Sequence, residues 1–303
     1  MWYNITIMDL TSPKIIKELL FQYDTRALKG LGQNFLINKN ILQKIIETAN
    51  LKATDIILEI GPGIGTLTKE LAQRVKKVIA VEKDKKMCEI LKETLSDFKN
   101  IKIINGDILK IENCKLKIEN YKVVANLPYY IASPVIRKFL EAENPPESMV
   151  LTLQKEVAQR ICAKPPDMSL LSVSVQFYAV PKIIFYVSKN YFWPSPKVDS
   201  AIIKITPLSF RRGPSSAVRG RASNQLFFKI VKAGFSQPRK QLAGNLAKNL
   251  LGEAKEKSFG RTGLPMLKDK KEVEIWLLKN NIKPNQRAET LSVKDWINLI
   301  NSF

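Results

Sequence analysis

Residues 56–66 read Ile56-Ile57-Leu58-Glu59-Ile60-Gly61-Pro62-Gly63-Ile64-Gly65-Thr66, an apolar run that passes directly into a glycine-rich turn. A run of this length that ends at glycine is typical of a buried strand, and a helical pattern begins at Thr66. Glycine lets the backbone approach a ligand closely, and open α/β sheets bind ligands at such strand-to-helix turns. Alone, the turn indicates a ligand site only weakly, because loops use glycine for many reasons.

Two acidic residues follow the next two predicted strands. The strand at residues 78–81 runs into Glu82, 21 residues after Gly61, and the strand at residues 101–104 is followed by Asp107. A carboxylate in the first position can accept both hydroxyls of a ribose, and a second at the same edge suits the exocyclic amine of adenine. Each acid alone could be a strand end or a helix cap. Because the glycines are spaced G-x-G-x-G rather than G-x-G-x-x-G, we expect S-adenosylmethionine here instead of NAD.

A further strand ending carries polar and aromatic side chains. Residues 123–125 are typical of a buried strand, and Asn126-Leu127-Pro128-Tyr129-Tyr130 ends it, because proline cannot continue a central ladder. Asn126 offers an acceptor for an amino group, and Tyr129 offers a flat face for a ring. We therefore expect a nucleobase to dock at this carboxyl edge, although a simple turn is the alternative.

Strand and helix patterns alternate through the first two thirds of the chain, which predicts an α/β fold with a doubly wound parallel sheet. The predicted strands are residues 56–60, 78–81, 101–104, 123–125 and 149–153, with closing strands at 172–178, 183–187 and 200–205, the last two as a possible hairpin. The predicted helices are residues 40–49, 67–75, 87–95, 134–140 and 155–163, and an earlier one capped by Thr11 or Ser12.

The composition changes at Phe210. Residues 211–221 combine cations and turn formers without periodicity, which predicts a linker or loop. Helical patterns follow at residues 226–235, 239–251, 271–280 and 293–300. We therefore divide the chain into an N-terminal extension (1–25), an α/β domain (26–209) and a small basic helical domain (210–303).

The charge balance predicts a polyanionic partner. The chain has 49 Lys and Arg against 28 Asp and Glu, a formal net charge of +21. Cations gain free energy when they displace counterions from phosphates, so nucleic acid is favoured over a membrane surface. No run approaches the ~20 apolar residues of a membrane span, and we expect a cytoplasmic protein.

Histidine is absent, and Cys88, Cys114 and Cys162 are isolated from one another. Histidine-based triads, general bases and metal ligands are therefore excluded, and we expect reduced thiols and no metal.

Five motifs, in this order, resemble the small-subunit ribosomal RNA adenine dimethyltransferases of the KsgA type, over nearly all of the chain from Arg26 onward. They are residues 31–36 (LGQNFL), 59–63 (EIGPG), 126–129 (NLPY), 153–157 (LQKEV) and 194–200 (PSPKVDS). The resemblance implies a class I methyltransferase (Rossmann-like) sheet with a small C-terminal helical domain.

The resemblance also implies a role for each candidate site residue. Asn34 and Leu36 are expected to close over the methionine end of S-adenosyl-L-methionine, with Gly61 beside it. Glu82 is expected on the ribose, Asp107 on the adenine, and Asn126 between cofactor and target. Catalysis is expected from Asn126, Leu127, Pro128 and Tyr129, with Tyr129 and Phe192 on the two faces of a flipped adenine. By itself, Phe192 would more simply be a core aromatic.

The implied product is N6,N6-dimethyladenosine at two adjacent adenosines near the 3′ end of small-subunit (16S) rRNA, within an immature 30S-type particle. A monomer is expected. The N6 lone pair of adenine is delocalised, so oriented acceptors and an activated methyl donor matter more than a strong general base. Stacking would repay the unstacking of the target base.

Three alternatives remain. A large-subunit rRNA methyltransferase of the macrolide-resistance type is disfavoured by Leu127, where that relative more often has isoleucine, and by residues 31–33. A non-catalytic RNA-binding assembly factor is disfavoured by the intact motifs, and an NAD oxidoreductase is the most remote.

In the helical domain, a basic surface for RNA phosphates is predicted from Lys229, Lys232, Arg239, Lys240 and Lys248.

Overall fold

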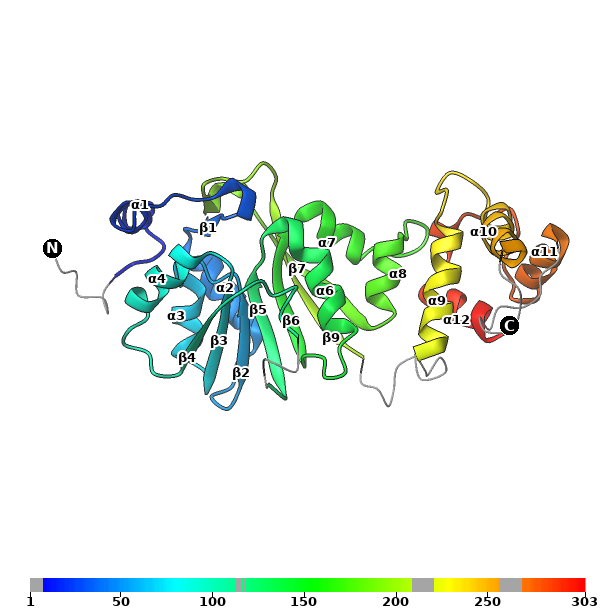
Figure 1. Ribbon diagram of the computed structural model, residues 1–303. Helices are drawn as coiled ribbons and strands as arrows, with labels where there is room; N and C mark the ends of the chain where they lie inside the picture. The colour runs from blue at the N-terminus through cyan, green and yellow to red at the C-terminus, as the bar shows by residue number, and fades with distance from the viewer. Residues whose placement is uncertain (1–7, 113–115, 117, 209–220, 257–268, 303) are drawn as a thin grey trace. The chain divides into compact units, whose positions relative to one another are not determined.

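The computed structural model describes residues 8–112, 116, 118–208, 221–256 and 269–302. Contacts divide the chain into two compact units (Figure 1). The first comprises Met1–Ala158 and Pro181–Pro207, and the second comprises Gln159–Val180 and Leu208–Phe303. Nearly all of the predicted linker at residues 211–221 lies outside the described residues, as does Cys114.

The first unit is built on a seven-stranded sheet in the order β4-β3-β2-β5-β6-β9-β7. The pairs from β4 to β6 are parallel, and β9 runs antiparallel to β6. The strands are β2 (Ile56–Ile60), β3 (Lys77–Glu82), β4 (Ile101–Asn105), β5 (Tyr121–Asn126), β6 (Ser148–Gln154), β7 (Ala179–Val187) and β9 (Ser200–Pro207). The predicted α/β class is confirmed, as are the core strands. The sheet as a whole is mixed rather than parallel.

The strand order reverses between β2 and β5, since the chain moves outward to β4 and then returns to the other side of β2. The loops after β2 and β5 therefore diverge, and this opens a crevice at their carboxyl ends. Gly61 and Asn126 lie at the ends of β2 and β5, and Glu82 and Asp107 lie at or after the ends of β3 and β4, so the parallel sheet brings these four predicted ligand residues to one edge.

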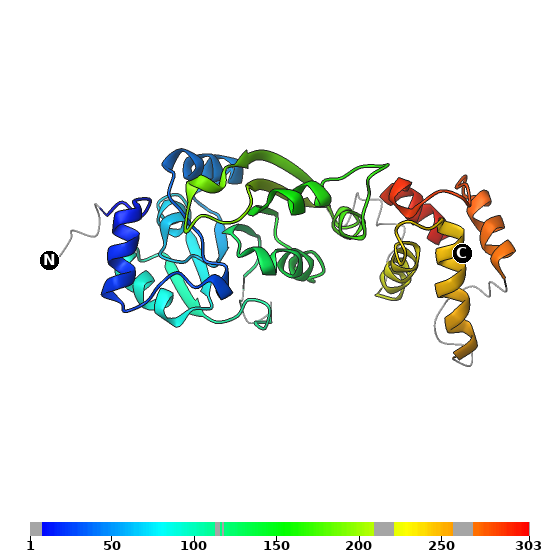
Figure 2. The same cartoon turned by 90° about the horizontal axis from the view of Figure 1, so that it is seen from above.

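Helices lie on both sides of this sheet, as seen from above in Figure 2. They are α1 (Pro13–Gln22), α2 (Lys39–Ala49), α3 (Thr66–Ala72), α4 (Lys85–Thr94), α6 (Ala132–Leu140) and α7 (Lys155–Ile161). Local caps begin two of them: Asn38 accepts from Ile41 N to begin α2, and Asp84 accepts from Lys86 N to begin α4. The predicted helices here are confirmed, with ends displaced by a few residues.

The N-terminal helix α1 is part of the first unit and packs against its glycine-rich turn and α4. Ile16, Leu19 and Leu20 are buried in a cluster that also holds Ile64 of the glycine-rich turn. The Thr66 hydroxyl donates to the carbonyl of Leu10 at 3.1 Å. The described part of residues 1–25 is therefore joined to the loop that carries the predicted cofactor site.

The strand predicted at residues 172–178 is wrong, because this segment is helix α8 (Leu170–Gln176). Ser169 and Ser172 form a reciprocal capping box, in which each side chain accepts from the backbone N–H of the other residue. Val173 and Phe177, four residues apart, are both buried in the core of the second unit. The cap and this spacing outweigh the strand preference of the valines.

The strands predicted at residues 183–187 and 200–205 are confirmed as parts of β7 and β9, which are neighbours in the sheet. The connection between them is more than a hairpin turn. It contributes β8 (Phe192–Trp193), which pairs antiparallel with β1 (Phe35–Leu36) in a separate two-stranded sheet.

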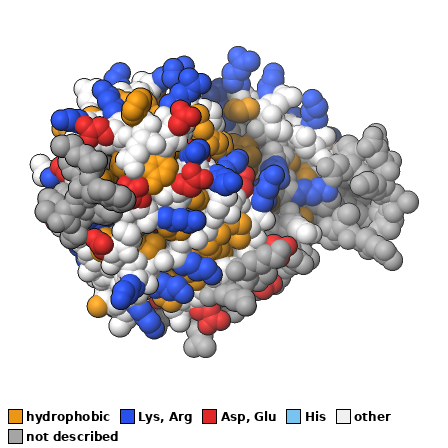
Figure 3. All heavy atoms as spheres, turned by 60° about the vertical axis from the view of Figure 1, so that its left-hand side comes forward, with side chains coloured by type: hydrophobic (Ala, Val, Ile, Leu, Met, Phe, Trp, Pro, Cys, Tyr) orange, Lys and Arg blue, Asp and Glu red, His pale blue; other side chains and the backbone are white. Residues whose placement is uncertain are grey.

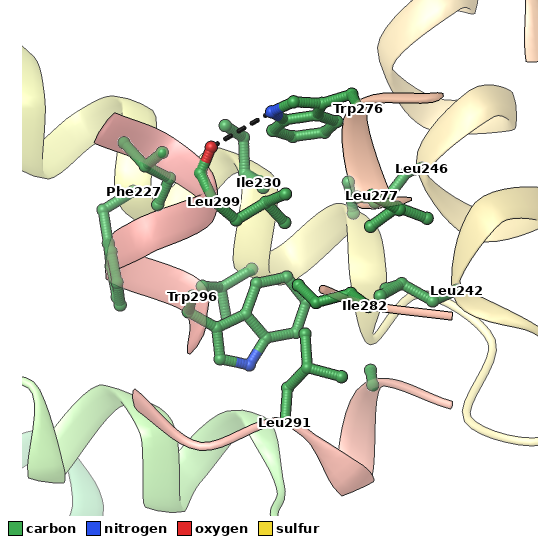
Figure 4. Close-up of a cluster of buried hydrophobic side chains, with 14 of the residues drawn as sticks. Phe227, Ile230, Leu242, Leu246, Trp276, Leu277, Ile282, Leu291, Trp296 and Leu299 are labelled. Atoms are coloured by element: carbon green, nitrogen blue, oxygen red, sulfur yellow. Dashed lines mark hydrogen bonds between the residues drawn. The ribbon is translucent and has the colours of Figure 1, made fainter. Parts of the chain in front are cut away.

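The second unit is helical. Besides α8, it contains α9 (Arg221–Gly234), α10 (Leu242–Glu256), α11 (Lys270–Lys279) and α12 (Val293–Asn301). Figure 4 shows its core, where Trp276 Nε1 donates to the carbonyl of Leu299 at 3.1 Å. The four predicted helices are confirmed, although α10 begins at Leu242 rather than Arg239. Within the described residues, no helix is long and apolar enough to cross a membrane.

Candidate active site

One pocket opens at the carboxyl ends of β2, β3, β4 and β5. The predicted site residues that line it are Asn34, Leu36, Gly61, Glu82, Asp107, Asn126, Leu127, Pro128 and Tyr129. Phe192 is the predicted residue that does not. Residues from four strand endings and from the loop before α2 are thus brought together.

Glu82 holds the glycine-rich turn in place. Its Oε2 accepts from Gly63 N at 3.1 Å, and its Oε1 accepts from Asp84 N at 2.9 Å. Gly61 and Gly63 have φ values of 68° and 60°, which a residue with a Cβ adopts at a cost. Burial raises the pKa of Glu82, and the two backbone donors only partly oppose this. The carboxylate keeps further lone pairs for a ligand.

Asp107 is held by its own turn and by a lysine. Its Oδ1 accepts from Leu109 N at 3.0 Å, and Lys83 Nζ lies 3.1 Å from Oδ2. Partial burial acts to raise the pKa of Asp107, but the Leu109 N–H and Lys83 outweigh it and leave the pKa below its usual value. Asp107 is therefore an ionised acceptor. Sequence reasoning missed Lys83, although it directly follows Glu82.

Asn126 joins the ending of β5 to the loop before α2. Its Nδ2 donates to the carbonyl of Asn34 at 2.9 Å, and Asn34 Nδ2 donates to the carbonyl of Gly32 at 3.1 Å. A Cβ on Gly32 would lie 3.2 Å from Pro128 Cβ, so the two loops are in close contact. Among the described residues, Asn126 Oδ1 accepts no hydrogen bond from the protein. Asn126 lines the pocket, so this oxygen is an acceptor available to a ligand there.

Tyr129 begins the turn after Pro128. Its hydroxyl and Ser200 Oγ lie 2.7 Å apart, which fixes the orientation of the ring. Burial raises the pKa of Tyr129, so the phenol is neutral at physiological pH. The next residue, Tyr130, lines the same pocket and is 53% exposed. Sequence reasoning assigned Tyr130 no role.

Phe192 lies behind the pocket wall in this structure. Its side chain is only 3% exposed and packs in a core cluster with Leu36 and Leu42. In the β1–β8 ladder it stands opposite Leu36, which does line the pocket. The ring thus supports Leu36, and a direct contact with an adenine remains a prediction.

Glu59 also lines the pocket, and sequence reasoning assigned it no role, although it lies in the motif at residues 59–63. It is 2% exposed, and its Oε2 finds no hydrogen-bond partner among the described residues. The pKa of Glu59 is raised to about 8. Burial is the main cause, the negative charge of Glu82 adds to it, and Thr68 partly opposes it. The available signal was its position, since it is the acid inside the apolar strand β2. With this raised pKa the carboxyl group is largely protonated at pH 7, and a cation bound beside it would favour its ionised form.

Within the described ranges, no group of three or more His, Cys, Asp and Glu side chains is placed to hold a metal ion.

Comparison with known proteins shows the family of the chain. A curated relative from Dehalococcoides mccartyi, "Ribosomal RNA small subunit methyltransferase A", is 44% identical over 92% of this chain and 89% of its own length. The protein of the same name from Alkaliphilus oremlandii is 42% identical over 97% and 98%.

Two solved structures are also similar. A dimethyladenosine transferase from Plasmodium falciparum superposes with a TM-score of 0.71 at 28% identity, over 87% of this chain and 95% of that one. The 23S rRNA methyltransferase ErmE gives a TM-score of 0.66 at 26% identity, over 89% and 99%. The family profile "Ribosomal RNA adenine dimethylase" matches residues 25–303, and the chain belongs to this family.

Proposed function

We propose that this enzyme transfers methyl groups from S-adenosyl-L-methionine to N6 of two adjacent adenosines near the 3′ end of small-subunit (16S) rRNA. The observation that carries the proposal is the arrangement of one pocket. It places Glu82 and Asp107 beside the Asn126–Tyr129 strand ending, in a chain of the rRNA adenine dimethylase family.

The small subunit is favoured over the large subunit as substrate. Relatives at 39–44% identity carry the small-subunit name, whereas the 23S rRNA methyltransferase structure is 26% identical. Leu127 and residues 31–33 favour the same choice.

The pocket residues fit the proposed cofactor. Glu82 can accept the two ribose hydroxyls, and the ionised Asp107 can accept from the adenine amine. Asn34 and Leu36 would cover the methionine end beside Gly61, and the buried acid Glu59 lies in the same pocket. The cofactor is positively charged at its sulfonium, and such a charge in the pocket would favour the ionised form of Glu59. Bound there, it supplies an activated methyl group.

Asn126 is proposed to orient the adenine N6 amine. Its Oδ1 would accept one N–H, and nearby backbone carbonyls of Asn126 and Leu127 would accept the other. Because the Nδ2 group is already bound to Asn34, the oxygen cannot rotate away without breaking that hydrogen bond. Pro128 restricts the backbone of the turn. Alignment of this kind accounts for much of the acceleration when the methyl donor is already activated.

Tyr129 is proposed to stack on the flipped adenine. Its hydrogen bond with Ser200 holds the ring in one orientation, so little conformational entropy is lost when the base binds. Phe192 is proposed to complete the base site, through Leu36 in the present packing or through its ring after a local shift.

The second unit is proposed to hold RNA phosphates. Arg239, Lys240 and Lys248 line a surface cavity at the start of α10. Asn245 fixes this segment, since its Nδ2 donates to the carbonyls of Gly234 and Gln237 at 2.7 and 2.9 Å. Lys229 and Lys232 add charge on α9. Phosphate contacts do not read sequence. We therefore infer that an immature 30S-type particle supplies the specificity, with the enzyme acting as a cytoplasmic monomer.

The test is to incubate the protein with labelled S-adenosylmethionine and immature small subunits, and separately with large subunits. Methylated adenosines are then mapped by mass spectrometry. We expect dimethylation of two adjacent adenosines in the small-subunit RNA. Label found only in large-subunit RNA would contradict the proposal, and no label in either would favour a non-catalytic assembly factor.

A further inference from the structure

Two motifs contribute little to the site described above, residues 153–157 and residues 194–200; of their residues only Ser200 has a role there, as the hydrogen-bond partner of Tyr129. In the fold they meet beside the target pocket. Gln154 at the end of β6 pairs with Ser200 at the start of β9, and Lys155 N donates to the carbonyl of Asp199 at 3.0 Å.

Asp199 also fixes a second lysine. Its Oδ1 accepts from Lys189 N at 3.0 Å, and Ser195 Oγ donates to the Lys189 carbonyl at 3.0 Å. The backbone of Lys189 is thus held on both sides while its side chain is exposed. Asp199 therefore brings Lys155 and Lys189 to one place on the surface.

An exposed aromatic ring lies next to Lys155. Tyr186, on the edge strand β7, is 51% exposed, and Lys155 Nζ lies 5.2 Å from the centre of its ring. Bases stack on exposed aromatic rings in single-stranded RNA sites, and cations beside them contact the phosphates. Lysine and arginine side chains are spread over the face visible in Figure 3, so the presence of cations alone does not mark a nucleotide site.

The same surface is directly connected to the target pocket. The Tyr129 hydroxyl lies 2.7 Å from Ser200 Oγ, and Ser200 follows Asp199 in the chain. Tyr129, which is proposed to stack on the target adenine, is thus hydrogen-bonded to the direct neighbour of Asp199, and Asp199 holds the backbones of both lysines.

We propose that Lys155, Tyr186 and Lys189 bind the nucleotide that flanks the flipped adenine, and we call these three residues the flanking-nucleotide platform. The proposal rests on the proposed function. Flipping a base costs a few kcal/mol of stacking, and holding its neighbour on a ring would offset part of that cost.

The local charge favours RNA over a protein strand added to the edge of β7. Residues 153–158 and 181–200 contain four lysines, Lys155, Lys182, Lys189 and Lys197, against two acids, Glu156 and Asp199. The Asp199 carboxylate already accepts from Lys189 N. A strand of neutral peptide would gain little from this charge, whereas RNA phosphates would.

The experiment measures steady-state methyl transfer to immature small subunits. We expect Tyr186→Ala to raise KM for the particle roughly 5- to 100-fold, with little change in cofactor affinity, because one stacked base is lost. Tyr186→Phe keeps the ring and should resemble the wild type. Lys102→Ala, on the exposed edge strand β4 at the other side of the sheet, is the matched charge control for Lys155→Ala and Lys189→Ala.

Particle binding without cofactor is measured in parallel as a function of salt. Lys155→Ala and Lys189→Ala should each flatten the slope of log K against log salt by about 0.7 to 1, and Lys102→Ala should not. Thermal unfolding of each variant checks that folding is unchanged.

The outcomes separate the two proposals. If the wild type methylates the particle and Tyr186→Ala keeps wild-type KM and binding, the platform is refuted while the proposed function stands. If the wild type binds the particle without methylating it, the proposed function fails, and the binding data alone decide the platform. If Lys102→Ala weakens particle binding as much as Lys155→Ala and Lys189→Ala do, the effect comes from net charge alone and the platform is also refuted.

Discussion

Asn126 donates its side-chain amide to the backbone carbonyl of Asn34 at 2.9 Å, across 92 positions of sequence. This single hydrogen bond joins the loop that would cover the cofactor to the strand ending that would receive the target base. Asn126 also lines the pocket, and its Oδ1 is the acceptor that we propose for the target amine. The two halves of the proposed reaction are thus positioned against each other before any ligand binds.

Asn126→Ala should lower kcat by about 100-fold or more while particle binding is preserved, because both the acceptor and the link to Asn34 are lost. Asn126→Asp keeps an acceptor but loses the donor to the Asn34 carbonyl, and should fall between the alanine variant and the wild type. Single-turnover methylation and particle binding are the measurements. Wild-type turnover in Asn126→Ala would refute the role given to this residue.

Gly63→Ala should weaken cofactor binding and lower stability by roughly 1 kcal/mol or more. The new Cβ would lie 3.0 Å from the Phe35 ring at a φ of 60°. The Gly63 N–H that holds Glu82 would then move. Gly30→Ala is the matched control, since a Cβ there meets nothing within 4 Å. Calorimetric titration with S-adenosylmethionine and urea unfolding should separate the two variants, and similar behaviour of both would contradict the assignment.

Glu59 should make stability depend on pH. Its pKa is about 8 in the folded chain against 4.5 for the ordinary side chain, so the folded state retains a proton that the unfolded state releases. Stability from this group is full below pH 4.5 and is lost as pH rises to about 8, a change of a few kcal/mol in all.

Glu59→Gln removes this titration. Relative to the wild type, the variant should therefore gain free energy of unfolding between pH 5 and pH 8.5, as measured by urea unfolding without ligand. Parallel curves for the two proteins across that range would show that Glu59 is already ionised in the folded chain.

Two substitutions of Phe192 should separate its role in packing from a role in catalysis. Phe192→Ala should cost about 3–5 kcal/mol of stability, because the ring is 3% exposed and its removal leaves a cavity behind Leu36. Phe192→Leu keeps most of the volume and removes the aromatic face. If the ring stacks on adenine, the leucine variant loses kcat/KM with little change in Tm. Wild-type kcat/KM in Phe192→Leu would restrict this residue to supporting Leu36.

Gly234→Ala should destabilise the second unit by about 1–3 kcal/mol. The added Cβ would stand 2.4 Å from the Trp296 ring, in the core drawn in Figure 4. Gly244→Ala on α10 meets nothing within 4 Å and should stabilise its helix by about 0.5–1 kcal/mol. Opposite shifts in the urea midpoint, followed by tryptophan fluorescence, are expected. Equal shifts would contradict the packing at Trp296.

Most elements could be predicted because their signals are local. Apolar runs that end at glycine or proline mark β2 and β5, and apolar spacing of three and four residues marks α2 and α4. The exception, α8, also has a local cause. The reciprocal Ser169–Ser172 cap competes with a valine-rich composition, and composition alone does not reveal which of the two prevails.

The sequence predicted those candidate site residues that lie at strand endings. Gly61, Glu82, Asp107 and Asn126 follow successive strands, and parallel strands bring their carboxyl ends to one edge. Lys83, Glu59 and Tyr130 were missed. Their relevance comes from a neighbour in space or from burial, and neither is visible in the residue itself.

The sequence by itself determined the fold class, most of the strands and helices of the first unit, and the set of residues at the ligand edge, because these depend on local periodicity and motif spacing. Only the tertiary structure decided which groups touch. It placed Phe192 opposite Leu36 in the β1–β8 ladder, left Glu59 Oε2 without a hydrogen-bond partner among the described residues, and gathered the backbones of Lys155 and Lys189 around Asp199. These relationships depend on strand register and loop closure, which join residues far apart in the chain.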